Sequence, residues 1–242
     1  MEIIALCSPS LLTFFFLFLS IYLFAYFSVI RNLGPKHRPE ASSCFISLAH
    51  GTPAVFMAIN ALINTQFPPS FASPNSVLHN IVLEYSISYF LMGLLHYLVF
   101  FPTDILFILH HLATLYVFSM CRYMVHRGAF ALLMLLILSE VTSLCQNVWT
   151  IAGFRKADVR AAAKLCKLLC PPFCALYSVA RGIMRPFLVY KMGIFYINGL
   201  AENLIPTWAW SSWMVVIITA ILVTTIWVFD HWMDWYKETI QL

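Results

Sequence analysis

The chain has 242 residues, of which 62% are hydrophobic and only 10% are charged, and its formal net charge is +4. Average soluble domains are roughly 25% charged, so this composition excludes an ordinary soluble protein. Neither a GxGxxG nor a GxxxxGK[ST] motif occurs, so nothing indicates a nucleotide-binding loop. Any ligand is therefore expected to bind within or against a membrane-embedded bundle.

Apolar residues are gathered into blocks of about 17 to 25 residues, the length that crosses a hydrocarbon core of ~30 Å. These blocks predict an all-α integral membrane protein with about seven transmembrane helices. The predicted spans lie at about residues 8–30, 44–66, 78–101, 104–124, 128–151, 172–196 and 208–230.

The first block is too long for the apolar core of a signal peptide and follows an acidic residue, Glu2, rather than a basic region. We expect it to remain in the mature protein as a signal anchor. Placing the N-terminus in the lumen puts nine lysines and arginines in cytosolic segments and four in lumenal ones, which favours that orientation and a cytosolic C-terminus. The nine are Arg31, Lys36, Arg38, Arg155, Lys156, Arg160, Lys164, Lys167 and Lys237, and the four are Arg122, Arg127, Arg185 and Lys191.

A basic helical face precedes the sixth span, where Arg160, Lys164 and Lys167 recur at helical spacing. This pattern predicts an interfacial helix that lies on an anionic membrane leaflet. A stripe of three cysteines in the same segment either packs against the bundle or carries palmitoyl groups. The three are Cys166, Cys170 and Cys174.

Ionisable side chains within a span cost roughly 2.5–3.5 kcal/mol each on insertion scales, which makes them functional candidates. Glu84 lies in the third span and Arg181 in the sixth. The two either form a buried ion pair or contribute to lipid binding, because an inward-facing arginine can hold a lipid phosphate or carboxylate. Pro186 is expected to bend the sixth helix near Arg181.

A polar stripe runs along the fifth span, where Glu140, Ser143 and Asn147 recur at helical spacing. Polar groups that faced lipid would be costly, so we expect the stripe to face the interior of the bundle. There it acts either as hydrogen-bonding glue between helices or as the wall of a wet cavity.

Two adjacent histidines lie in the apolar segment DILFILHHLATLYVFSM, at residues 104–120. Asp104 begins the predicted helix, where it can cap the backbone, and Thr114 neighbours both imidazoles. Because His110 and His111 diverge by about 100° around the helix, we expect one of them to face the interior. A neutral imidazole there can act as a base or a nucleophile, with hydrogen-bonded packing and lipid binding as alternatives. HExxH is absent, and we expect neither a metal nor a cofactor.

The run DxxxxxHHxxT at residues 104–114, followed by Arg-Gly at 127–128 and a polar fifth span, resembles the TLC domain family. The resemblance implies six helices around a lipid-accessible cavity, preceded by one peripheral helix, in the endoplasmic reticulum or a related endomembrane. It extends over about residues 40–235. An N-terminal anchor with a basic loop at 1–39 and a short cytosolic tail at 236–242 flank that domain.

In the ceramide synthase branch of the family, paired histidines serve acyl transfer from acyl-CoA to a sphingoid base, and the resemblance places that role on His110 and His111. Those enzymes also carry a His-Asp element, where this chain has Leu135-Leu136. The segment SEVTSLCQNVW at residues 139–149 instead resembles the Glu-x-(Ser/Thr)-x4-Asn pattern of TLC-domain-containing proteins outside that branch.

We therefore expect a multi-pass endomembrane protein that binds membrane lipids or takes part in lipid homeostasis, with no nucleic-acid partner. The alternatives are an acyl-CoA-dependent N-acyltransferase of the ceramide synthase type and a secretory-pathway cargo receptor or chaperone. In the acyltransferase alternative, the predicted catalytic residues are His110, His111 and Glu140. The predicted lipid-binding residues are Asp104, Thr114, Ser143, Asn147, Arg181 and Glu84.

Overall fold

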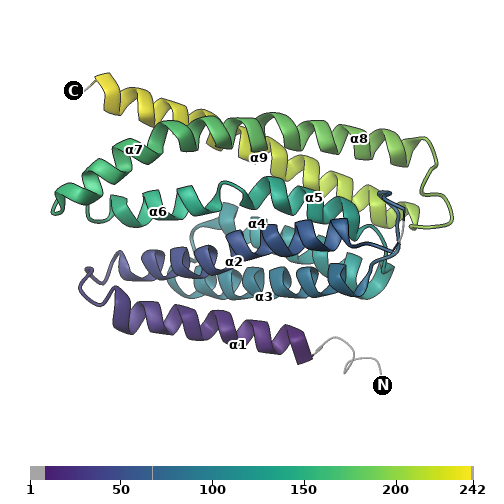
Figure 1. The fold of residues 1–242 in the computed structure, drawn as a ribbon, viewed down its shortest axis with the longest axis horizontal. Coiled ribbons are helices and arrows are strands. Elements are labelled where there is room, and N and C mark those ends of the chain that lie inside the picture. Colours follow the sequence, from purple (N-terminus) through teal and green to yellow (C-terminus); the bar gives the residue numbers. More distant parts are fainter. Residues whose placement is uncertain (1–8, 67, 241–242) are drawn as a thin grey trace.

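Nine α-helices and no β-strand make up the part of the chain that the computed structural model describes, residues 9–66 and 68–240 (Figure 1). Helices are expected in hydrocarbon because they satisfy their backbone polar groups internally. The helices are α1 (Pro9–Phe24), α2 (Arg38–Ile63), α3 (Val77–Phe100), α4 (Ile105–Ser119), α5 (Ala129–Glu140), α6 (Ser143–Gly153), α7 (Arg160–Tyr177), α8 (Arg185–Ile197) and α9 (Thr207–Ile240).

Seven helical segments of the described chain are long and apolar enough to cross a membrane. Helices α5 and α6 together form one of them, Ala129–Gly153, and α7 and α8 form another, Arg160–Ile197. Each of the other five helices lies in a segment of its own. The predicted all-α, multi-pass fold with about seven spans is therefore confirmed.

Two of the predicted spans contain irregularities. The fifth is divided by a turn at Val141 and Thr142, which separates α5 from α6. The sixth is continuous with the predicted interfacial helix, so the basic segment is the first part of a longer helix rather than a separate element. A π-helical turn, Ser178–Met184, joins α7 to α8 just before Pro186. Figure 1 shows α7 inclined to α8 across this turn, near the position where the proline was expected to bend the helix.

The cysteine stripe of α7 is buried, whereas the three cations of its basic face are exposed. Cys170 and Cys174 pack in a cluster with Phe173 and Tyr177, and the Cys166 thiol contacts the backbone carbonyl of Trp149. A palmitoylated thiol would have to be accessible. The structure therefore favours packing as the role of these cysteines.

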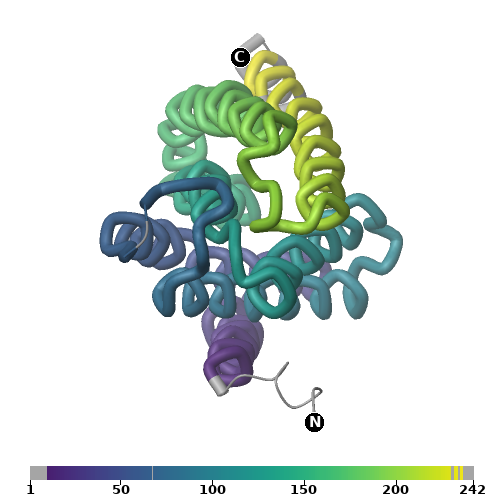
Figure 2. The backbone as a smooth tube through the Cα atoms, turned by 90° about the vertical axis from the view of Figure 1, so that its right-hand side faces the viewer, coloured from purple at the N-terminus to yellow at the C-terminus, as the bar shows by residue number. Residues whose placement is uncertain are grey.

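Helix α1 lies at the edge of the bundle (Figure 2) but is joined to α3 by hydrogen bonds. The Ser88 hydroxyl donates to the Leu11 carbonyl at 2.8 Å, and the Tyr22 hydroxyl is hydrogen-bonded to Nδ1 of His96 at 3.0 Å. Phe18 of α1 is completely buried. This helix is therefore an integrated part of the bundle.

The two ends of the bundle differ in their connections. At one end, the Asn75 side chain donates to the Cys121 carbonyl and accepts from the Ala129 amide, which joins the α2–α3 and α4–α5 connections. At the other end lie the α1–α2 and α6–α7 connections and the C-terminal part of α9 (Figure 1). The site described below occupies the half of the bundle nearest this second end.

Candidate functional site

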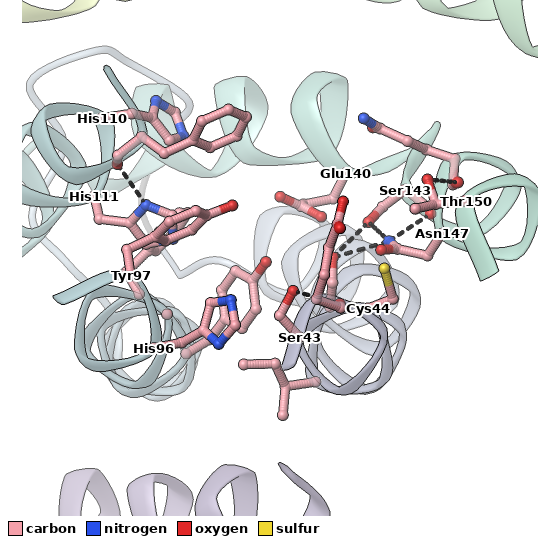
Figure 3. Close-up of a pocket in the computed structure, with 18 of the residues that line it drawn as sticks. Ser43, Cys44, His96, Tyr97, His110, His111, Glu140, Ser143, Asn147 and Thr150 are labelled. Carbon is pink, nitrogen blue, oxygen red and sulfur yellow. Dashed lines mark hydrogen bonds between the residues drawn. The ribbon is translucent and has the colours of Figure 1, made fainter. Parts of the chain in front are cut away.

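A partly open cavity of about 370 Å³, here called the outer chamber, is lined by residues of α2, α3, α4, α6 and α7, together with Glu140 at the end of α5, Arg181 and Trp227. Figure 3 shows the histidines of α4 on one wall, with Glu140, Ser143 and Asn147 facing them from another part of the bundle. Its volume falls within the roughly 300–1,000 Å³ of pockets that hold small molecules. Helices distant in sequence thus converge on one polar space.

A smaller and more apolar cavity of about 100 Å³, here called the inner pocket, adjoins the outer chamber. The two linings share Phe90, His110, Glu140 and Arg181, so the cavities lie next to each other. Most of the remaining wall is aliphatic. It includes Val117, Leu132, Leu135, Leu136, Val216 and Ile217.

Both histidines of α4 line the outer chamber, rather than one as predicted. Their rings are nearly perpendicular, with centroids 5.6 Å apart. Nδ1 of His111 is 2.8 Å from the Phe107 carbonyl oxygen. Because a carbonyl can only accept, Nδ1 donates, and neutral His111 therefore has its lone pair on Nε2. The Thr114 hydroxyl lines the inner pocket and donates to the His110 carbonyl, not to an imidazole.

Gly93 of α3 makes room for the His111 imidazole. A Cβ atom added at Gly93 would lie 2.5 Å from Nε2 and 2.8 Å from Cδ2 of His111, which is far inside van der Waals contact. The absence of a side chain at this one position therefore allows the imidazole to lie against α3.

Glu140 lines the chamber, and His50 of α2 lies buried behind its carboxylate, outside the chamber lining. Nδ1 of His50 lies 3.9 Å from Oε2 of Glu140, and Nε2 is hydrogen-bonded to the Ser86 hydroxyl at 3.1 Å. The His50 ring stacks on Tyr89, with centroids 4.0 Å apart. These contacts from α2 and α3 fix the surroundings of the carboxylate.

A second glycine, Gly51, lets α2 approach the polar stripe of α5 and α6. A Cβ atom there would lie 2.7 Å from the Ser143 hydroxyl and 2.9 Å from Oε2 of Glu140. The Asn147 amide donates to the hydroxyls of Ser47 at 2.9 Å and Ser143 at 3.1 Å. The stripe faces the interior as predicted, and it serves both as glue between helices and as a chamber wall.

Arg181 is held at the junction of the two cavities. One of its terminal nitrogens donates to the Ser139 carbonyl and the other to the Tyr177 hydroxyl at 3.4 Å, while its Cζ atom lies 4.7 Å from the centroid of the Tyr177 ring. Both hydrogen-bond acceptors are neutral. The guanidinium therefore remains a positive group at the chamber wall.

Two predicted site residues lie outside both cavities. Asp104 caps α4, as predicted, by accepting from the Phe107 amide. Glu84 is paired with Arg122 instead of Arg181, at 2.6 Å from Nη2 and 2.8 Å from Nε, and it also accepts from the Ser10 hydroxyl. The predicted pair with Arg181 was wrong because Arg122, which the charge count placed in a lumenal segment, reaches α3.

No sequence pattern predicted the contribution that four further residues make to the site, namely His50, Gly51, Gly93 and Arg185. Arg185 was counted in a lumenal segment, yet it is buried and lines the inner pocket. A glycine inside a span is a recognised signal of close helix approach, so the two glycines could have been found. Which side chain approaches each glycine could not be read from the sequence.

The fold and the chamber define an all-α, multi-pass membrane protein with a polar cavity among its helices. The TLC domain model matches residues 40–233. A TLC domain-containing protein of Arabidopsis thaliana is 52% identical over 232 residues, which cover 95% of this chain and 91% of that protein. The chain belongs to the TLC domain family. No solved structure matches it.

Proposed function

We propose that this protein binds membrane lipids in the adjoining outer chamber and inner pocket and thereby takes part in lipid homeostasis. The observation that carries the proposal is that a polar chamber adjoins an aliphatic pocket, with four lining residues in common. A lipid has the same two parts, a polar headgroup and a hydrocarbon chain. Leu135 and Leu136, which replace the His-Asp element of the ceramide synthases, form part of the apolar wall.

We also propose that the protein resides in the endoplasmic reticulum or a related endomembrane, with its N-terminus in the lumen and its C-terminus in the cytosol. The α1–α2 and α6–α7 connections lie at the same end of the bundle as the C-terminus (Figure 1). They carry four of the nine cations assigned to the cytosol, and four more lie in the adjoining parts of α2 and α7. Positive residues favour the cytosolic side of a membrane. The outer chamber would then lie in the cytosolic half.

Loss of the protein is expected to change the membrane lipid composition of a null line, measured by mass spectrometry across acyl-chain and headgroup classes. A His111→Ala variant should fail to restore the wild-type profile although it still inserts into membranes. His126→Asn is the matched control, because His126 is exposed at a positive φ of 57° that asparagine tolerates. An unchanged lipid profile in the null line would contradict the proposal, and selective retention of certain secretory proteins would then favour the cargo-receptor alternative.

A second candidate function, N-acyl transfer, is favoured by the lone pair on Nε2 of His111 in the same chamber as Glu140. In this reaction an amine attacks the thioester carbonyl of acyl-CoA, a C–N bond forms, the C–S bond breaks, and the coenzyme A thiol leaves. A histidine would take the amine proton as a general base.

Purified protein given palmitoyl-CoA and a labelled sphingoid base should then release labelled amide and free coenzyme A in equal amounts. The blank is the double variant His110→Ala/His111→Ala. Turnover that does not exceed this blank would reject acyl transfer to that acceptor and would leave lipid binding as the proposal.

A further inference from the structure

We infer that Arg181 and Arg185 together form an anion-binding site, so that the lipid held in the chamber is an acidic one, with a carboxylate or phosphate headgroup. The inference rests on the proposed lipid-binding function and narrows its ligand. Arg185 is the strongest support for this inference, because none of the residues that the structure describes pairs directly with its charge.

Arg185 is buried, with 9% of its surface exposed, and lines the inner pocket. Its Nε atom is fully buried without a hydrogen-bond partner, and no hydrogen bond or salt bridge joins Arg185 to the residues that the structure describes. A charge in the membrane interior is costly unless it is paired or functional. A buried arginine without a partner is therefore a candidate ligand-binding group.

Arg181 adds a second positive group one helical turn earlier. Its two hydrogen bonds go to the neutral Ser139 carbonyl and the Tyr177 hydroxyl, and its Nε atom is also buried without a partner. Residues four apart lie near one another on a helix surface. The π-helical turn Ser178–Met184 contains Arg181 and ends immediately before Arg185, and such turns are frequent at functional sites.

The charges of the inner pocket do not balance. Glu140 is the carboxylate in the described lining of this pocket, and it interacts electrostatically with both Arg181 and Arg185. It is also within 3.9 Å of His50. One carboxylate shared by two guanidiniums leaves a net positive charge, which an anionic headgroup would neutralise.

The chemistry of the pocket favours a lipid anion over a free one. Guanidinium groups bind carboxylates and phosphates through paired N–H donors. The same pocket is lined by Val117, Leu136 and Ile217, against which the first methylenes of an alkyl chain can pack. At about 100 Å³ the pocket is smaller than the roughly 300 Å³ needed to enclose a whole small ligand, so it holds only part of the lipid.

The test measures the shift in melting temperature of the full chain in neutral detergent with palmitate, hexadecyl phosphate or hexadecanol, which share one alkyl chain length. Wild-type protein should be stabilised by one or both acidic lipids and less by the alcohol. The acidic lipid that raises the melting temperature more identifies the preferred headgroup. Arg185→Met should bind that acid roughly thirtyfold more weakly or worse, the usual consequence of removing one partner of a buried charge pair. Lys191→Met is the control, because Lys191 is an exposed cation of the same helix.

Stability without lipid separates ligand binding from a structural role. Because Arg185 has no direct partner, Arg185→Met without lipid should melt at the wild-type temperature or above it. A marked loss of stability would show that the cation serves the fold and would overturn the inference. Equal stabilisation by all three compounds, or an undiminished acid shift in Arg185→Met, would also overturn it while leaving lipid binding intact. Absence of any shift with all three would count against the proposed function itself.

Discussion

Replacing Arg122 with methionine is expected to lower the free energy of unfolding by about 3–5 kcal/mol, the usual cost of breaking a buried ion pair. Glu84, its partner, is only 3% exposed; it accepts a hydrogen bond from Nε of Arg122 and forms a salt bridge with Nη2. Without Arg122 the carboxylate would remain within the bundle with Ser10 as its remaining side-chain donor. Unfolding of the purified protein in neutral micelles measures the loss.

Two further variants separate this ion pair from a general effect of removing a cation. Arg160→Met removes an exposed arginine and should change stability by less than about 0.5 kcal/mol. The double variant Glu84→Gln/Arg122→Met removes both charges and should recover most of the stability lost in the single variant. A double variant no more stable than Arg122→Met would contradict the assignment of the loss to an unpaired carboxylate.

Replacing Gly93 with alanine is expected to displace His111 and to abolish the function that depends on it. The added methyl group would lie 2.5 Å from Nε2 of His111, and overpacking of this kind costs typically 1–3 kcal/mol. Lipid-induced stabilisation of the purified protein and rescue of the lipid profile of a null line measure the effect. Both should fall to the level of His111→Ala.

Gly153→Ala is the matched control, because nothing lies within 4 Å of the position that its Cβ would occupy. It should be neutral or stabilising by up to about 1 kcal/mol, since alanine is the better helix former. The double variant Gly93→Ala/His111→Ala should be no worse than either single change, because both act on one imidazole. A Gly93→Ala protein with full lipid response would refute the role of this glycine.

Hydropathy and helical spacing were sufficient to predict the spans and the inward-facing stripe, because both depend on local sequence. Asn147 and Ser143 line the chamber for the reason given in advance, namely that their helix face is too polar for lipid. The partner of Glu84 depended instead on long-range packing, since Arg122 is 38 residues away and lies in a π-helical turn. No local pattern encodes that contact.

The number of histidines in the chamber was mispredicted because the divergence of adjacent Cβ atoms was treated as the divergence of the rings. The imidazoles extend beyond the helix surface, so His110 reaches the border with the inner pocket while His111 lies against α3. The opening that admits His111 is supplied by Gly93, on another helix. The positions of both rings were therefore decided by neighbouring helices that the local sequence does not describe.

The hydrogen bonds between α1 and α3 affect both truncation of the chain and its insertion into the membrane during synthesis. The family domain begins at residue 40, but Ser88 and His96 bond to residues that are 77 and 74 positions earlier in the chain. A fragment reduced to the family domain would lose both of these hydrogen bonds to α1. During synthesis α1 enters the membrane before α3 has been made. The hydroxyl of Tyr22 therefore stays without its partner His96 until α3 has been inserted. The unit of folding is thus longer than the unit of homology.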